Sequence, residues 1–189
     1  MSHINFVFFA TTFGIAFKSG KKPYACCRGM HSTVEALLDL MQEHKFGGDD
    51  IERIIVHGAD RTVRQFSKRE VLTLLDAQFS MPYALAVVAA TGRAGLDEFH
   101  PPRAQDADVR ALMNRVEIVP DRKLGPYDEP DLEVRGRKGQ VWSRHVPLPR
   151  GAPQRRLEGE HLLRKDEAVA VPVIGQRQFD ALHEAVMTL

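Results

Sequence analysis

The spacing of apolar residues along the chain switches between a helical and an extended period. Apolar residues recur at i, i+3, i+4 and i+7 between Ser32 and Lys45, which predicts an amphipathic helix. The segment from Ile51 to His57 contains a short apolar run and predicts a buried strand. Tyr83 to Thr91 is rich in Ala and Val and apolar on nearly all sides, so we expect a deeply buried helix there. Ser80 stands where it can cap that helix.

The rest of the chain adds shorter helices, a further strand and a hairpin. In chain order we predict a polar connection at 61–68, a short helix at 71–75, a helix at 106–114, a strand at 116–119, a β-hairpin at 132–146, a Pro/Gly-rich linker at 147–153 and helices at 157–170 and 179–189. This mixture of helices, strands and one hairpin favours an α+β fold. We expect helices packed on a small sheet that contains the hairpin, followed by C-terminal helices.

We expect three parts in the chain: an apolar N-terminal segment at 1–21, an α+β domain at 22–150, and a linker with C-terminal helices at 151–189. Ile4 to Phe17 is almost wholly apolar, but it is shorter than the ~20 residues that a transmembrane helix needs. The lysines follow this segment, whereas a signal peptide carries its basic residues before the apolar stretch. We therefore expect no membrane partner and expect the segment to contact further protein; an anchor on a membrane surface is the alternative.

Composition excludes several classes of protein. With 43% hydrophobic and 27% charged residues in 189 positions, the chain is typical of a folded globular protein. The formal net charge of +1 gives no sign of a nucleic-acid partner. Both cysteines, Cys26 and Cys27, are adjacent and unsuited to a mutual disulfide, which favours a reducing compartment and a cytoplasmic location.

The segment from Lys22 to His31 carries the most chemistry. It brings a lysine, an arginine, a histidine, a tyrosine and both cysteines into ten positions, directly before the predicted helix. Cationic side chains beside a helix N-terminus, with its unpaired N–H groups, predict a pocket for an anion such as a carboxylate. The alternative is an ordinary turn before a helix that Ser32 and Glu35 close with a capping box.

Several separated motifs resemble one family of enzymes. They are Lys22-Pro23-Tyr24-Ala25-Cys26-Cys27-Arg28 with His31, Phe79-Ser80-Met81-Pro82-Tyr83-Ala84, Gly95-Leu96-Asp97-Glu98-Phe99, Asp108-Val109-Arg110-Ala111-Leu112 and Pro149-Arg150-Gly151-Ala152-Pro153. From about Lys22 onward, the chain resembles the smaller α+β domain of the MmgE/PrpD family. That family includes 2-methylcitrate dehydratase, cis-aconitate decarboxylase and iminodisuccinate epimerase.

The resemblance implies a two-domain enzyme that acts on small di- and tricarboxylic acids. Family members pair a large helical domain with this smaller domain, form homodimers, and need no metal or organic cofactor. Several family histidines, an aspartate and a lysine belong to the helical domain. We expect residues 1–21 to be a remnant of that domain or a contact to it. We also expect a helical domain on another chain, or a homodimer, to complete the site.

The family's chemistry suggests roles for six residues. Dehydration of a hydroxy acid needs a base, an acid and cations or donors that hold carboxylates. We expect Tyr83, His31 and Lys22 to be catalytic, with Lys22 also binding substrate. The resemblance places Lys22 and Tyr83 at family pocket positions. For these three residues the alternatives are core packing for Tyr83, a helix cap for His31 and a surface lysine for Lys22.

Cys27, Arg28 and Ser80 are the further expected substrate-binding residues. Cys27 falls where the decarboxylases of the family carry a histidine, which favours a dehydratase-like member. Arg28 is suited to bidentate pairing with a substrate carboxylate, or to a structural ion pair. Cys27 has the alternative of a small buried residue, and Ser80 that of a helix cap.

The resemblance implies a lyase domain of the 2-methylcitrate dehydratase type, incomplete without a helical domain. Two alternatives remain for the chain as a whole. It is a non-catalytic truncated remnant of such an enzyme, or it is a binding module that associates with itself. In the second case, the surface that faces the helical domain in the family would form the contact.

Overall fold

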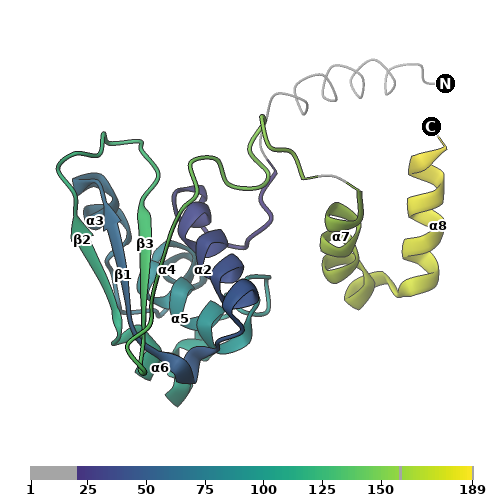
Figure 1. Ribbon diagram of the computed structural model, residues 1–189. Coiled ribbons are helices and arrows are strands. Elements are labelled where there is room, and N and C mark those ends of the chain that lie inside the picture. The colour runs from purple at the N-terminus through teal and green to yellow at the C-terminus, as the bar shows by residue number, and fades with distance from the viewer. Residues whose placement is uncertain (1–20, 158, 189) are drawn as a thin grey trace. The chain divides into compact units, whose positions relative to one another are not determined.

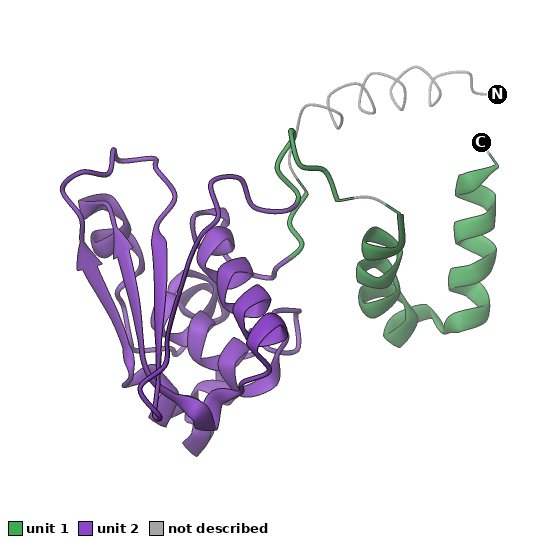
Figure 2. Cartoon of the chain, viewed as in Figure 1, with its two compact units in different colours: residues 1–23, 151–189 green, residues 24–150 purple. Residues whose placement is uncertain are grey.

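The computed structural model describes residues 21–157 and 159–188 and divides the chain into two units (Figures 1 and 2). Unit 2 comprises Tyr24–Arg150, and unit 1 comprises Met1–Pro23 and Gly151–Leu189. The apolar segment predicted within residues 1–21 lies outside the described residues, apart from Lys21. The two units are considered separately below.

Unit 2 is built on a four-stranded mixed sheet in the order β2-β1-β3-β4. Its strands are β1 Ile51–Gly58, β2 Val116–Pro120, β3 Asp131–Gly136 and β4 Val141–His145. β1 pairs parallel with β2 and antiparallel with β3, and β3 and β4 form the predicted hairpin. On β1, Ile54 and Val56 are buried and face Val134 and Leu132 in the register of β3, which forms the centre of the core.

Helices of unit 2 pack on this sheet (Figure 1). They are α2 His31–His44, α3 Asp60–Phe66, α4 Leu74–Phe79, α5 Met81–Thr91 and α6 Ala107–Met113, with short 3-10 turns at Arg28–Met30, Gly48–Asp50 and Pro101–Gln105. α2 contacts α5, β3 and β4, while α3 lies against β1 and β2. Together with two helices in unit 1, the described residues form seven α-helices and one mixed sheet. The fold is therefore α+β, as the sequence predicts.

α5 confirms the prediction of a buried helix. Every residue from Met81 to Ala89 is buried, so this helix has no polar face. Ser80 caps it, because its Oγ accepts a hydrogen bond from the backbone N–H of Tyr83 at 3.2 Å. Gly92 ends it at φ 69°, a left-handed conformation that glycine adopts without strain.

Unit 1 contains two predicted helices in its described part, α7 Gly159–Ile174 and α8 Gln176–Met187. None of the described residues of α7 is buried, and Phe179 is the buried one among those of α8. Large apolar side chains on both helices are exposed, including Val173 and Leu182. These two helices thus bury little apolar surface of their own.

The capping-box interpretation of α2 is wrong. The helix begins at His31, with Met30 at the cap position, and no side chain caps it. Ser32 lies inside the first turn and is buried. The carboxylate of Glu35 is fully buried and instead binds Arg150, because a buried charge needs a partner of opposite charge.

Two predicted elements after β1 also differ from the structure. Residues 61–68, expected to be a polar connection, lie largely in α3, whose Thr62 and Phe66 form a buried i, i+4 pair on a helix of two turns. The short helix expected at 71–75 instead begins at Leu74, where Thr73 and Asp76 cap each other reciprocally. In both places the apolar period is too short to fix the element's bounds.

Candidate functional site

The segment before α2 is held in place by backbone hydrogen bonds. The N–H of Ala25 donates to the carbonyl of Ala94 at 3.0 Å, and the N–H of Cys27 donates to the carbonyl of Gln78 at 2.9 Å. The segment therefore bonds both to the end of α4 and to the loop that follows α5. At Gly29, an added Cβ would lie 2.8 Å from the ring of Phe66, so the backbone passes close to α3. These contacts fix the position of the residues that follow.

His31 is fully buried at the start of α2. Its Nε2 lies 3.3 Å from the carbonyl oxygen of Cys26, and its ring meets the ring of Tyr24 edge-on at 5.2 Å between centroids. A carbonyl only accepts hydrogen bonds, so this contact requires the tautomer with a proton on Nε2. The imidazole is thus oriented by the same segment that carries Cys27 and Arg28.

Arg28 and Cys27 are partly exposed. The Nη1 of Arg28 donates to Oε1 of Glu129 at 2.9 Å, and the arginine side chain remains 43% exposed. One of its N–H groups is used in this ion pair, while a guanidinium carries five. Cys27 is a free thiol of intermediate burial. The structure therefore contains the protein ion pair that the sequence left open as an alternative for Arg28.

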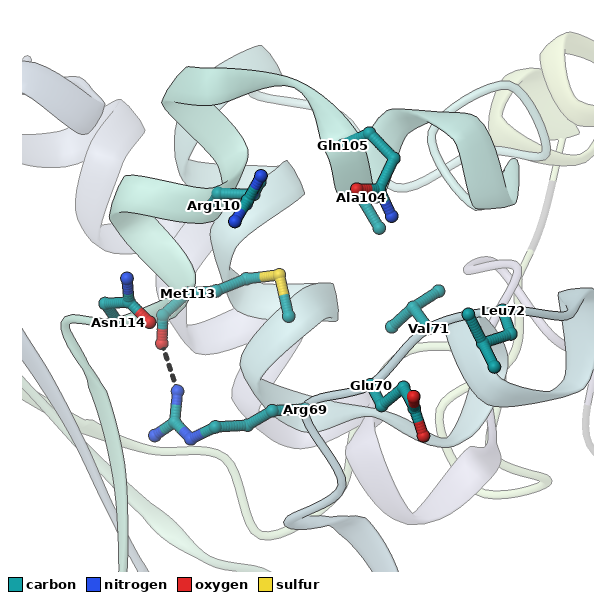
Figure 3. Close-up of a pocket in the computed structure, with 9 residues that line it drawn as sticks. All are labelled: Arg69, Glu70, Val71, Leu72, Ala104, Gln105, Arg110, Met113 and Asn114. Carbon is teal, nitrogen blue, oxygen red and sulfur yellow. Dashed lines mark hydrogen bonds between the residues drawn. The ribbon is translucent and has the colours of Figure 1, made fainter.

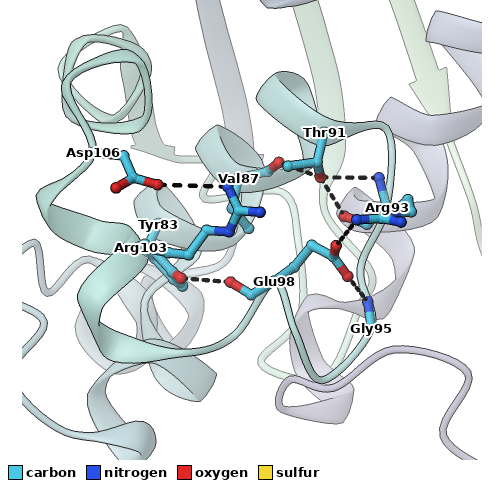
Figure 4. A network of polar contacts seen from close by, with 8 residues as sticks. All are labelled: Tyr83, Val87, Thr91, Arg93, Gly95, Glu98, Arg103 and Asp106. Carbon is cyan, nitrogen blue, oxygen red and sulfur yellow. Dashed lines mark hydrogen bonds and ion pairs between the residues drawn. The ribbon is translucent and has the colours of Figure 1, made fainter. Parts of the chain in front are cut away.

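Ser80 and Tyr83 lie together at the start of α5, and both are buried. Figure 4 shows Tyr83 with the carbonyl of Glu98 that its hydroxyl contacts. The Oγ of Ser80 donates to the carbonyl of Lys68 at 2.5 Å, in addition to capping the helix. The hydroxyl of Tyr83 lies 2.5 Å from the carbonyl oxygen of Glu98 and 3.2 Å from that of His100. Burial raises the pKa of the Tyr83 phenol to about 12, so this hydroxyl is a neutral donor.

The loop that receives the Tyr83 hydroxyl is itself tied by ion pairs and hydrogen bonds (Figure 4). The carboxylate of Glu98 is nearly buried, accepts from the N–H of Gly95 at 2.8 Å and lies 3.0 Å from Nη2 of Arg93. Glu98 and Gly95 belong to a motif that the sequence singled out, but their roles were not predicted. The i, i+3 spacing of the two residues, typical of a turn, is the signal that was available.

A second buried carboxylate, Glu35, connects α2 to the end of unit 2. Its Oε2 accepts from the backbone N–H of Arg150 at 2.7 Å, and its Oε1 lies 3.2 Å from Nε of Arg150. Nη2 of Arg150 also binds Asp39 at 2.8 Å, one helical turn further along. The i, i+4 spacing of Glu35 and Asp39 indicates that one basic side chain can bind both carboxylates. Which basic residue does so depends on the fold.

Lys22 lies in unit 1 and is exposed. Its neighbour Lys21 donates its backbone N–H to the carbonyl of Gly151 at 2.7 Å. Among the six predicted residues, Ser80 and Tyr83 are in direct contact, through the hydrogen bond that caps α5. Cys27, Arg28 and His31 follow one another along a segment that is bonded to Gln78, two residues before Ser80.

Two cavities in the described part of unit 2 are lined by other residues. The larger, of about 350 Å³, lies between residues 69–72 and residues 104–114 (Figure 3). Arg69 forms part of its wall and donates to the carbonyls of Met113 and Val116 at 2.5 Å each, so its donors bind the backbone. None of the six predicted residues lines this cavity or a second one of about 290 Å³ within the described residues.

The described residues contain no group of three or more His, Cys, Asp or Glu side chains placed to hold a metal ion. Their helices are all too short or too polar to span a bilayer.

Comparison with known families decides where this fold belongs. The family model of the MmgE/PrpD C-terminal domain matches residues 24–189. The chain belongs to the MmgE/PrpD family. The match begins at Tyr24 and includes both the sheet domain of unit 2 and the two helices of unit 1. The resemblance of the motifs is therefore confirmed for the C-terminal domain of this family. A search of the curated proteins finds no match to the chain.

Proposed function

We propose that this chain is the C-terminal domain of a lyase that acts on small di- or tricarboxylic acids, of the 2-methylcitrate dehydratase type. The observation that carries the proposal is the match of the MmgE/PrpD C-terminal domain over residues 24–189. A helical domain, on another chain or in a homodimer, completes the site. The proposed domain bounds are 22–150 for the α+β part and 151–189 for the linker and C-terminal helices.

In this proposal, the segment from Lys22 to His31 binds the substrate carboxylates. Arg28 supports the assignment, because its guanidinium is partly exposed and has donors beyond the one that binds Glu129. Lys22 is exposed and supplies a second cation. Cys27 and Ser80 complete the binding set, with Ser80 acting through the first turn of α5.

His31 and Tyr83 carry the proton transfers in this proposal. The contact of His31 Nε2 with the carbonyl of Cys26 fixes the orientation of the ring, which a positioned acid or base requires. The hydroxyl of Tyr83 is bonded to the carbonyls of Glu98 and His100. A catalytic role for Tyr83 therefore requires residues 98–100 to move when substrate and the helical domain bind.

The test begins with affinity purification of the tagged chain from its own cells and mass spectrometry of what accompanies it. A stoichiometric helical partner is the expected result. The purified pair is then assayed for dehydration, decarboxylation and epimerisation, with 2-methylcitrate, citrate, cis-aconitate and iminodisuccinate as substrates. We expect dehydration of 2-methylcitrate. An intact pair without activity on any of these acids would contradict the proposal and favour a non-catalytic remnant.

Variants of two arginines test the binding role. Arg28→Gln should lower kcat/KM by about 10- to 100-fold, because it removes a charge-assisted hydrogen bond to a carboxylate. Arg53→Gln is the matched control, since Arg53 is also an exposed arginine paired with a single glutamate, Glu117, at 3.3 Å. An equal loss in both variants would assign the effect to stability and not to substrate binding.

A self-associating module is the second candidate. The exposed apolar residues of α7 and α8 favour it, because unpartnered apolar faces of this kind mark interaction surfaces. This candidate predicts a solution mass that rises with protein concentration and, unlike the first, no helical partner in the affinity purification.

A further inference from the structure

A cavity of about 290 Å³ lies where the two parallel strands of the sheet end. Its lining comes from residues that directly follow β1, including Asp60, Arg61 and Arg64, and from residues that follow β2, including Asp121 and Arg122. The strands are parallel, so their carboxyl ends meet at one edge of the sheet. In open α/β sheets, ligands bind in crevices at this edge.

A backbone hydrogen bond connects the two loops that form the cavity. The N–H of Asp121 donates to the carbonyl of Gly58 at 2.7 Å, directly where both strands end. Gly58 also passes close to Thr62 of α3, whose Cγ2 would lie 2.8 Å from an added Cβ. The backbone around the cavity is thus held in place by contacts among β1, β2 and α3, whose positions Figure 1 shows.

The arginines of this cavity differ from most others in unit 2. Among the described residues of that unit, most arginines bind a carboxylate, as Arg28 does, or backbone carbonyls, as Arg115 does. Those with neither kind of acceptor are Arg61, Arg64, Arg110 and Arg122. Three of these four line the same cavity. The cavity therefore concentrates guanidinium donors that have no acceptor within the described protein.

Two carboxylates, Asp60 and Asp121, line the cavity as well. Asp60 and Asp121 form no ion pair with any of the three within the described residues. Oδ1 of Asp121 instead accepts from the N–H of Lys123 at 2.9 Å. The guanidinium of Arg61 lies 4.5 Å from the ring centroid of Tyr127, a contact that orients the cation. The cavity is therefore lined both by guanidinium donors and by carboxylate acceptors that are not paired with each other in the described part of the chain.

We propose that this cavity binds a small ligand that carries both an oxyanion group and hydroxyl groups. Guanidinium groups bind phosphate and carboxylate oxygens in bidentate geometry, and carboxylates accept hydrogen bonds from hydroxyls. Arg61, Arg64 and Arg122 hold the oxyanion, while Asp60 and Asp121 accept from the hydroxyls. The ligand is either a sugar phosphate or a hydroxy acid, which share this chemistry. None of the residues of the proposed lyase site lines the cavity, so the two proposals stand independently.

The experiment is calorimetric titration of the full chain at low ionic strength with glucose 6-phosphate, citrate and inorganic phosphate. Saturable binding of glucose 6-phosphate or of citrate is expected. Tighter binding of glucose 6-phosphate indicates a sugar phosphate as the ligand, and tighter binding of citrate indicates a hydroxy acid. Arg64→Gln and Arg122→Gln should each weaken this binding by about 10-fold or more. Arg110→Gln is the matched control, because Arg110 also lacks an acceptor but lies outside the cavity. Arg53→Gln should also leave the titration unchanged, because Arg53 lies outside the cavity and is paired with Glu117.

Asp60→Asn tests the hydroxyl recognition. It removes a negative charge, so inorganic phosphate should bind more tightly, while the preference for the hydroxylated ligand over inorganic phosphate should fall. The proposal is overturned if neither glucose 6-phosphate nor citrate binds at millimolar concentrations. It is equally overturned if Arg110→Gln weakens binding as much as Arg64→Gln does. Circular dichroism confirms the fold of each variant, and these exposed side chains leave the core intact.

Discussion

At the scale of single residues, Tyr83 decides whether the start of α5 is a catalytic or a structural feature. Its buried hydroxyl is bonded to two backbone carbonyls, of Glu98 and His100. Tyr83→Phe leaves these carbonyls without their donor, so we expect the free energy of unfolding to fall by about 1–3 kcal/mol. Urea denaturation measures this loss. Tyr127→Phe is the control, because Tyr127 is 82% exposed and its substitution should change little.

The alkaline limb of the stability curve gives an independent test of the same residue. The pKa of Tyr83 is raised to about 12 by burial, whereas in the unfolded chain the phenol has its ordinary pKa of about 10. The unfolded chain therefore loses its proton first, and the stability falls as the pH rises from about 10 to about 12. Tyr83→Phe should make this fall shallower. An unchanged alkaline limb would contradict the buried, neutral phenol.

The partner of Glu35 could not be predicted from the local sequence. Its position three residues after Ser32 matches a capping box, yet its carboxylate binds Arg150, which lies 115 positions away in the chain. The competing partner becomes visible only when the fold brings the end of unit 2 beside α2. The placement of Ser80 as a cap, by contrast, depends on residues within one turn and was predicted correctly.

At the scale of elements, long periodic segments were predictable and short ones were not. The helix α2, the buried helix α5 and the hairpin of β3 and β4 follow from periods that extend over several residues. α3 and α4 have seven and six residues, so each shows about two turns of pattern, and the first was missed as a connection. The parallel pairing of β1 with β2 also depends on the crossover through four helices, which no local pattern encodes.

The N-terminus of α4 gives a prediction at this scale. Asp76 accepts from Nζ of Lys68 at 2.6 Å and from Thr73, and these contacts hold the pKa of its carboxyl well below its usual range. A depressed pKa in the folded state stabilises the protein above the unfolded pKa of about 4, and this contribution is lost as the pH falls further. Asp76→Asn should therefore lower the stability more at pH 7 than at pH 2.

Thermal unfolding from pH 7 to pH 2 measures this difference. Asp108→Asn is the matched control, because Asp108 also lies in the first turn of a short helix but has no ion pair within the described residues. The difference between parent and Asp76→Asn should shrink on acidification, while Asp108→Asn should follow the parent throughout. A constant difference at all pH values would show that the capping geometry, and not the charge, stabilises α4.

At the scale of the whole molecule, the two units differ in how well each buries its apolar residues. Unit 2 contains nearly all of the buried core, from Tyr24 to Val146. The described part of unit 1 is dominated by α7 and α8, where Phe179 is the buried residue among those described and several large apolar side chains are exposed. Both proposed functions give this surface a partner, either a helical domain or a second copy of the chain.

Self-association of the isolated chain follows from this imbalance. On α8, Leu182 and Val186 are more than half exposed on the face that also carries the buried Phe179. We expect the solution mass to rise with concentration in sedimentation equilibrium. Leu182→Asp should raise the dissociation constant by about tenfold or more, because a buried leucine contributes about 1.5–3 kcal/mol to association. Val141→Asp is the control, since Val141 is equally exposed on β4 of unit 2. A helical partner that covers α7 and α8 should abolish this self-association, whereas a mass independent of concentration would exclude the self-associating module.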